Sequence, residues 1–216
     1  MTLAVLVGMA LAVSPARATL AAPSSRAIEV RNDGAEAAAV DVERTPRWLR
    51  IRPEGFVLRA GAHAVVTVRA LSPAHARAGD HELVLFLRAR PLGSTRIAVR
   101  MRLGVRLRVR MPGRLVHRFA LLGLSVRRQP HRRVLLLGVA NAGNVTEQLR
   151  GATVMLVRRG SVVSRLRWRH ARELVPGARA LLAFPYRGRV RGLVTAITAA
   201  HAAGAVTVQR RFHLRL

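Results

Sequence analysis

The sequence predicts an all-β protein made of two tandem immunoglobulin-like β-sandwich domains that follow an N-terminal signal peptide. The first observation is a succession of short segments in which apolar and polar residues alternate, separated by Gly, Pro, Asn and Asp. The second is that no helical periodicity is sustained anywhere. The third is that the second half of the chain repeats the turn pattern of the first. Half of the 216 residues are hydrophobic, which is enough for two cores.

The strands predicted in the first half are short and regularly spaced. They lie at Ile28–Val30, Val40–Val42, Trp48–Ile51, Phe56–Leu58, Ala64–Ala70, Glu82–Ala89 and Ile97–Met111. Seven strands in a unit of about 100 residues are typical of the immunoglobulin-like sandwich.

The longest alternation runs from Ile97 to Met111, with apolar residues at the odd positions and mostly arginine at the even ones. Such a strand has one apolar and one cationic face. Its length exceeds the usual range of about 3 to 10 residues, and Gly104 interrupts the arginines, so a bulge, a bend or a passage between sheets is predicted there. Pro112 and Gly113 then close the unit, which predicts domains at residues 26–112 and 113–216.

Two turn motifs recur in both halves of the chain. Asn32-Asp33-Gly34 corresponds to Asn141-Ala142-Gly143-Asn144, and Leu58-Arg59-Ala60-Gly61 corresponds to Leu174-Val175-Pro176-Gly177. In each half the Leu-x-x-Gly turn leads into a predicted strand. The recurrence predicts two copies of one architecture.

Residues 1–18 are predicted to be a signal peptide, cleaved after Ala18. A short apolar run, Leu3 to Val13, precedes the small-x-small pattern Ala16-Arg17-Ala18, although no basic side chain precedes Arg17. No later stretch of about 20 residues is free of charge, so we expect no transmembrane helix in the mature chain. The protein is expected to be secreted or extracytoplasmic and peripherally associated with the envelope of a bacterial cell.

The charge is strongly positive, and it favours polyanionic partners. The 38 basic residues are all arginine and face 10 acidic residues, for a net charge of +28. Arginine without lysine beside abundant Ala, Val and Leu is also typical of a GC-rich genome. The expected partners are an anionic cell-wall polymer or lipid headgroups, together with another surface protein; nucleic acid ranks below these because aromatic residues for base stacking make up only 4% of the chain.

Two rows of arginines are the candidate polyanion-binding residues. They are Arg100, Arg102, Arg106, Arg108 and Arg110 in the long alternation, and Arg165, Arg167 and Arg169 around Trp168. On a strand, alternate side chains repeat every ~6.6 to 7 Å and could contact successive phosphates. The other interpretation is a solvated outer face on which arginine prevents edge pairing.

The sequence contains none of the enzymatic or metal-binding motifs that we sought. It lacks a nucleophile elbow, a phosphate-cradling glycine loop, a zinc-protease motif and a calcium loop. The absence of cysteine excludes disulfides and thiolate metal sites. His81 lies between Asp80 and Glu82, which we interpret as a polar turn entering a strand. We therefore predict a non-enzyme with no catalytic residue, no metal site and no cofactor.

The recurring motifs, with Trp48 and Pro73, resemble the pattern of secreted immunoglobulin-like domains in pilus-chaperone-like and WxL-interacting bacterial surface proteins. In the latter family the first domain is thought to engage the cell wall and the second a partner protein. The resemblance implies an exported envelope-binding or scaffold protein. The alternative is an extracytoplasmic chaperone-like protein that binds clients by β-augmentation at an unpaired edge beside Ile97–Met111. A nucleic-acid-binding protein is the third hypothesis.

Overall fold

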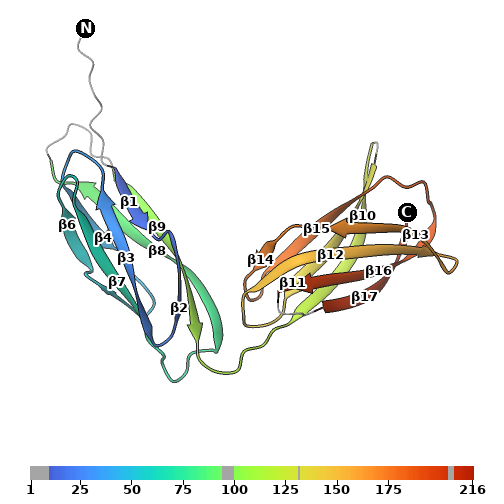
Figure 1. Cartoon of the computed structure of the whole chain (residues 1–216), viewed down its shortest axis with the longest axis horizontal. Coiled ribbons are helices and arrows are strands. Elements are labelled where there is room, and N and C mark those ends of the chain that lie inside the picture. Colours follow the sequence, from blue (N-terminus) through green and yellow to red (C-terminus); the bar gives the residue numbers. More distant parts are fainter. Residues whose placement is uncertain (1–9, 94–99, 131, 204–206) are drawn as a thin grey trace, which may run out of the picture. The chain divides into compact units, whose positions relative to one another are not determined.

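The computed structural model describes residues 10–93, 100–130, 132–203 and 207–216, and the chain divides into two compact units, Met1–Gly113 and Arg114–Leu216. All regular elements within these described segments are β-strands (Figure 1). Since they include no helix, they supply no helical membrane span. The predicted class, all-β with two tandem sandwiches, is confirmed.

The first unit packs two sheets face to face. One sheet has the antiparallel order β1-β3-β7-β5, and the other has the order β2-β9-β8-β4-β6, in which only β2 and β9 run parallel. The strands are β1 (Leu11–Ser14), β2 (Arg17–Ala21), β3 (Ser24–Asn32), β4 (Ala38–Val42), β5 (Leu49–Arg52), β6 (Gly55–Leu58), β7 (His63–Ala70), β8 (Gly79–Pro91) and β9 (Met101–Met111).

The core of the first unit follows from period-two alternation on both sheets. On β3 and β7 the inward residues Ile28, Val30, Val66 and Val68 are fully buried. On β9 the odd-numbered residues from Val105 to Met111 are at most 1% exposed. Each sheet thus buries its apolar face against the other, as the alternation predicts.

The beginning of the chain bears on the predicted signal peptide and on the start of the first domain, both of which stay predictions. Residues 1–9 lie outside the described residues, but Leu11–Ser14 pair with β3 and Arg17–Ala21 pair with β9. Ala18 and Leu20 are buried in the core. Cleavage after Ala18 would remove β1 and the first two residues of β2.

The second unit is also a sandwich of two antiparallel sheets. One has the order β10-β11-β15; the other has the order β13-β12-β16-β17, with β14 pairing β12 as well. The strands are β10 (Phe119–Gln129), β11 (Arg132–Asn141), β12 (Glu147–Arg158), β13 (Ser161–Trp168), β14 (Arg172–Leu174), β15 (Arg179–Tyr186), β16 (Leu193–Ala202) and β17 (Thr207–Arg215).

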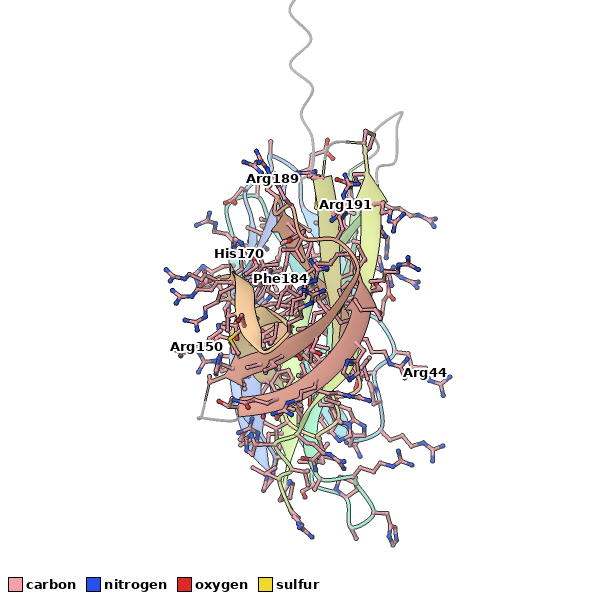
Figure 2. The ribbon with its side chains drawn as sticks, turned by 90° about the vertical axis from the view of Figure 1, so that its right-hand side faces the viewer. Arg44, Arg150, His170, Phe184, Arg189 and Arg191 are labelled. Carbon is pink, nitrogen blue, oxygen red and sulfur yellow. The ribbon has the colours of Figure 1, made fainter. Side chains whose placement is uncertain are left out.

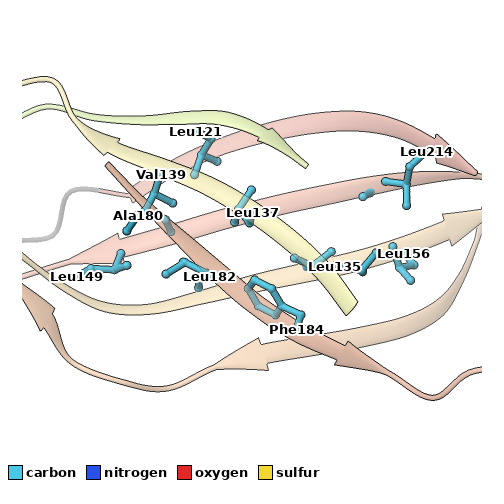
Figure 3. Close-up of a cluster of buried hydrophobic side chains, with 14 of the residues drawn as sticks. Leu121, Leu135, Leu137, Val139, Leu149, Leu156, Ala180, Leu182, Phe184 and Leu214 are labelled. Carbon is cyan, nitrogen blue, oxygen red and sulfur yellow. The ribbon is translucent and has the colours of Figure 1, made fainter. Parts of the chain in front are cut away.

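Leucine and phenylalanine fill the space between these two sheets. Leu135 and Leu137 of β11 and Leu182 and Phe184 of β15 face the residues of β12, among them Leu156, and all are at most 1% exposed (Figure 3). Burying side chains of this size contributes about 1.5–3 kcal/mol each.

A buried asparagine closes one end of each sandwich. In the first unit the Asn32 side chain is fully buried, and its amide donates to the carbonyls of Glu36, Leu58 and Arg59. Its Oδ1 accepts from the N–H of Gly34, 3.0 Å away. The Asn32 backbone carbonyl accepts from Gly61, whose φ of +71° suits glycine.

The second unit repeats this arrangement with two carbonyl acceptors instead of three. The Asn141 amide donates to the carbonyls of Val145 and Leu174 at 2.7 and 2.8 Å, and its Oδ1 accepts from Gly143. Its backbone carbonyl accepts from Gly177, which has φ +76°. The two motifs that recur in the sequence are therefore the two halves of one contact.

Replacing either asparagine with alanine is expected to destabilise its own unit. In Asn141→Ala the carbonyls of Val145 and Leu174 lose their donor in a dry site, and each such group costs about 1–3 kcal/mol. We expect the free energy of unfolding of the second unit to fall by about 3 kcal/mol or more, measured by urea denaturation. Gln209→Ala, at an exposed side chain, should change it by less than about 0.5 kcal/mol. Equal midpoints for Asn141→Ala and Gln209→Ala would contradict this role.

Candidate functional site

Strand β9 is paired along its whole length on one side but only in part on the other. It pairs β8 from Met101 to Met111 without a shift of register. On the opposite side β2 pairs only Arg106 to Arg110. Among the described residues, no strand pairs this second edge from Met101 to Val105.

The backbone groups of this open segment face outward in a defined pattern. The Arg106 N–H donates to the carbonyl of Ala16, and the Arg110 carbonyl accepts from the N–H of Ala22, so even-numbered residues direct their backbone groups towards the β2 side. Because this direction alternates along a strand, the N–H and C=O of Arg102 and Gly104 lie on the open edge.

The opening arises because the first stretch of the sandwich changes sheets. β1 pairs β3 in one sheet, whereas β2 pairs β9 in the other, with Pro15 and Ala16 between them. β1 approaches β9 in space without pairing it. Met101 and Leu103 are half-buried against the core beside this opening. An open backbone edge therefore lies next to apolar side chains.

Three arginines of the β9 row are held in ion pairs, two with acidic residues of β8 and one with Glu43, which follows the end of β4. Arg110 pairs with Asp80 and Arg108 with Glu82, each opposite its partner on β8. Arg102 forms a bidentate pair with Glu43 at 2.7 Å, and Arg88 binds the same carboxylate at 2.8 Å. Glu43 thereby separates two arginines that stand opposite each other in the ladder.

Two of these pairs shift a pKa. Hydrogen bonds from Arg102 and then from Arg88 lower the pKa of Glu43 below its ordinary value, because both stabilise the carboxylate. A hydrogen bond to Asp80, whose side chain is fully buried, raises the pKa of Arg110 further above its ordinary value. The cationic face of β9 is therefore partly neutralised by the protein itself.

The other members of the β9 row lie at its open end and beside β2. Arg100 precedes β9 and lines a shallow pocket of about 360 Å³ with Asp41, Arg88 and Arg90. Arg106 stands in register with Arg17 of β2. Neither Arg100 nor Arg106 has an acidic partner among the described residues. Ile97 to Val99, the start of the predicted strand, lie outside the described residues.

Gly104 does not mark the bulge, bend or sheet change expected from the sequence, since the β8–β9 register is continuous through it. It stands opposite Phe86, whose ring carries the Arg102 guanidinium 3.5 Å above its centroid. A Cβ at position 104 would lie 3.0 Å from Val84 and 3.3 Å from Phe86. Glycine makes room for the aromatic ring that supports Arg102.

The second row lies on an edge strand of the second unit. β13 pairs only β12, and Arg165 and Arg167 are exposed there, with Arg169 just beyond its end. The Arg165 guanidinium lies 3.8 Å from the sulfur of Met155, and no acidic partner of the three occurs in the described part of the chain. The two rows of arginines belong to different units.

The sequence interpretation missed the acidic partners. Asp80 and Glu82 were interpreted as a polar turn around His81, but they belong to β8 and point at β9, while His81 binds the carbonyl of Arg77. Their alternate spacing opposite a row of arginines was the available signal. Within the described residues, no group of His, Asp and Glu is arranged to hold a metal ion.

Glu43→Gln is expected to reduce the acid sensitivity of the first unit. Because the pKa of Glu43 is lower in the folded than in the unfolded protein, its stabilisation is fully present above the ordinary value of 4.5 and is lost as the pH falls through the lowered pKa. Urea midpoints measured between about pH 3 and pH 6 should fall less steeply in Glu43→Gln than in the wild type. Glu54→Gln, whose partner Arg52 is 3.7 Å away in solvent, is the control. Identical pH profiles for Glu43→Gln and the wild type would refute the assignment.

No protein-family model and no curated protein matches the chain. Solved structures do match. The class 5 fimbriae chaperone CfaA is 11% identical with a TM-score of 0.56, over 94% of this chain and 98% of that one. A chain from a chaperone–tip adhesin complex described as vital for CFA/I fimbriae biogenesis is 10% identical with a TM-score of 0.53, over 95% and 98%. At this identity the likeness shows the fold of two immunoglobulin-like sandwiches. Both structures are of fimbrial chaperones or of their complexes, and neither is of a WxL-interacting protein.

Proposed function

We propose that this protein is an extracytoplasmic chaperone that binds a client polypeptide by adding the client's strand to the open edge of β9. The observation that carries the proposal is the unpaired backbone of Arg102 and Gly104, beside half-buried Met101 and Leu103. In β-augmentation, backbone hydrogen bonds supply affinity and alternate side chains supply specificity. A client strand with alternating apolar residues fits both features.

The ion pairs of β9 support this function by holding the edge in place. Three of its arginines are tied to β8 or to Glu43, and the register with β8 is continuous, so the open segment is preorganised for pairing. Exposed arginine on a strand also protects an open edge against uncontrolled association. The likeness in fold to the fimbrial chaperones agrees with a client that is another exported protein. No catalytic group is required.

A pair of substitutions at Arg102 isolates the contribution of its backbone N–H. Arg102→Ala removes the ion pair with Glu43 and keeps the N–H, whereas Arg102→Pro removes both, and proline is tolerated on an edge. The probe is an immunoglobulin-like domain that lacks its last strand, with the intact domain as control. We expect the wild type and Arg102→Ala to suppress aggregation of the truncated domain and Arg102→Pro to lose about tenfold in affinity, the equivalent of one net hydrogen bond. Equal affinities of the two variants would exclude pairing at this edge.

The second candidate function is binding of an anionic cell-wall polymer or lipid headgroups through Arg165, Arg167 and Arg169. It is favoured by the distribution of charge, since the second unit has 20 arginines and two acidic residues. Such binding would retain the protein at the cell envelope.

Replacing these three arginines with serine tests this candidate. Co-sedimentation with cell walls, with anionic liposomes and with duplex DNA at about 0.15 M salt compares the ligands under screened conditions. We expect the triple variant to lose most binding to walls or liposomes, and Arg102→Ser/Arg108→Ser to lose little because those arginines are already paired. Preferential binding to DNA would exclude this candidate.

A further inference from the structure

A pocket in the second unit is lined by six arginines. Its volume is about 640 Å³, and it lies between the β10–β11 turn, the segment after β15 and the end of β17. The arginines are Arg128, Arg132, Arg133, Arg187, Arg191 and Arg215. The described residues that line it include no aspartate or glutamate.

No acidic side chain in the described part of the chain neutralises the charge of this pocket. None of the six guanidinium groups has an acidic partner among the described residues. The two acidic residues of the second unit lie elsewhere: Glu147 binds His117 at 2.6 Å, and Glu173 belongs to β14. Six like charges around one hollow repel one another, so an anion from outside would stabilise the site.

The walls of the pocket are held by hydrogen bonds. The Arg133 guanidinium donates to the carbonyl of Val190 at 2.9 Å, which ties β11 to the segment after β15. Gly192 and Leu216 exchange two backbone hydrogen bonds of 3.0 Å, which tie that segment to the end of β17. Arg132 donates to the side-chain oxygen of Gln129 across the β10–β11 turn. The site is therefore largely preformed.

A second observation at the same place concerns Tyr186. Tyr186 lines the pocket and is 2% exposed, yet its hydroxyl has no hydrogen-bond partner among the residues that the structure describes. The hydroxyl lies directly beneath Gly188, where a side chain would collide with it. A buried donor without an acceptor is uncommon in folded proteins.

We propose that this pocket binds a small multivalent phosphate anion, of about the size of a triphosphate. Guanidinium groups bind phosphate oxygens bidentately, and six of them exceed what one monovalent anion could engage. A volume of about 640 Å³ is within the range of small-molecule sites. The Tyr186 hydroxyl donates to a ligand oxygen. The site lies in the other unit from the β9 edge, so its test is independent of the chaperone proposal.

Titration calorimetry with inorganic tripolyphosphate at about 0.15 M salt tests the proposal. We expect one tripolyphosphate per chain and a loss of about 100-fold in affinity in Arg187→Ser/Arg191→Ser, because two charge-assisted contacts are removed. Both arginines are exposed, so folding is preserved. Tyr186→Phe should lower the affinity about tenfold; an unchanged affinity would exclude the hydroxyl as a donor to the ligand.

The matched control removes the same charge elsewhere on the second unit. Arg150 and Arg172 are exposed and do not line the pocket, and Figure 2 shows Arg150 far from Arg191 on this unit. Arg150→Ser/Arg172→Ser should change the affinity less than about threefold. Equal losses in the two double variants, or several tripolyphosphates per chain, would show diffuse electrostatic binding and overturn the proposal.

A competition experiment separates a free phosphate compound from a lipid headgroup as the source of the anion. Vesicles of phosphatidylglycerol in phosphatidylcholine are added to the complex of the protein with tripolyphosphate. Displacement that depends on Arg187 and Arg191 assigns the site to a headgroup, and retention of tripolyphosphate assigns it to a soluble phosphate. Either result supports binding of a phosphate anion in this pocket. Absence of tripolyphosphate binding by the wild type overturns the proposal.

Discussion

The contact on which both sandwiches depend is the buried asparagine that joins two turns at one end of each unit. At the end of a sandwich, several backbone carbonyls are buried away from water where no strand can pair them. A buried carbonyl without a hydrogen-bond donor lowers the stability of the fold. Asn32 and Asn141 supply amide donors to these carbonyls and an acceptor for a local N–H. The turn that Asn32 binds leads into β7, and the turn that Asn141 binds leads into β15. This contact therefore determines where each of these strands begins.

Acidic residues are distributed unequally between the two units. Eight of the ten acidic residues belong to the first unit, and three of them, Glu43, Asp80 and Glu82, are used against β9 and its neighbour. The arginines on the cationic face of β9 therefore form ion pairs with these acidic residues, and the ion pairs hold β9 in register with β8. In the second unit the arginines have almost no acidic counterparts. Arginine thus stabilises the arrangement of strands in the first unit, whereas in the second unit most arginines have no acidic partner among the described residues to neutralise their charge.

The open edge of β9 follows from a division of the first strand region between two sheets. β1 closes one sheet and β2 covers only the second half of β9, so no strand of the described residues pairs the edge of β9 from Met101 to Val105. The apolar alternation of β9 fills the core from Val105 onward, and the half-buried Met101 and Leu103 continue it to the opening. One strand thereby contributes to the core and presents a pairing surface.

The sequence by itself determined the fold class, seven of the nine strands described in the first unit and the repeated turns, because period-two alternation and turn residues are local signals. Only the tertiary structure decided which arginines are neutralised, since Glu43 lies 59 residues before Arg102 and a register is needed to pair them. It also placed Leu11 to Ala18 inside the sandwich, where an apolar run before small residues suggests a signal peptide. The six-arginine pocket escaped the sequence interpretation because its members come from three separate segments that meet only when the sheets close.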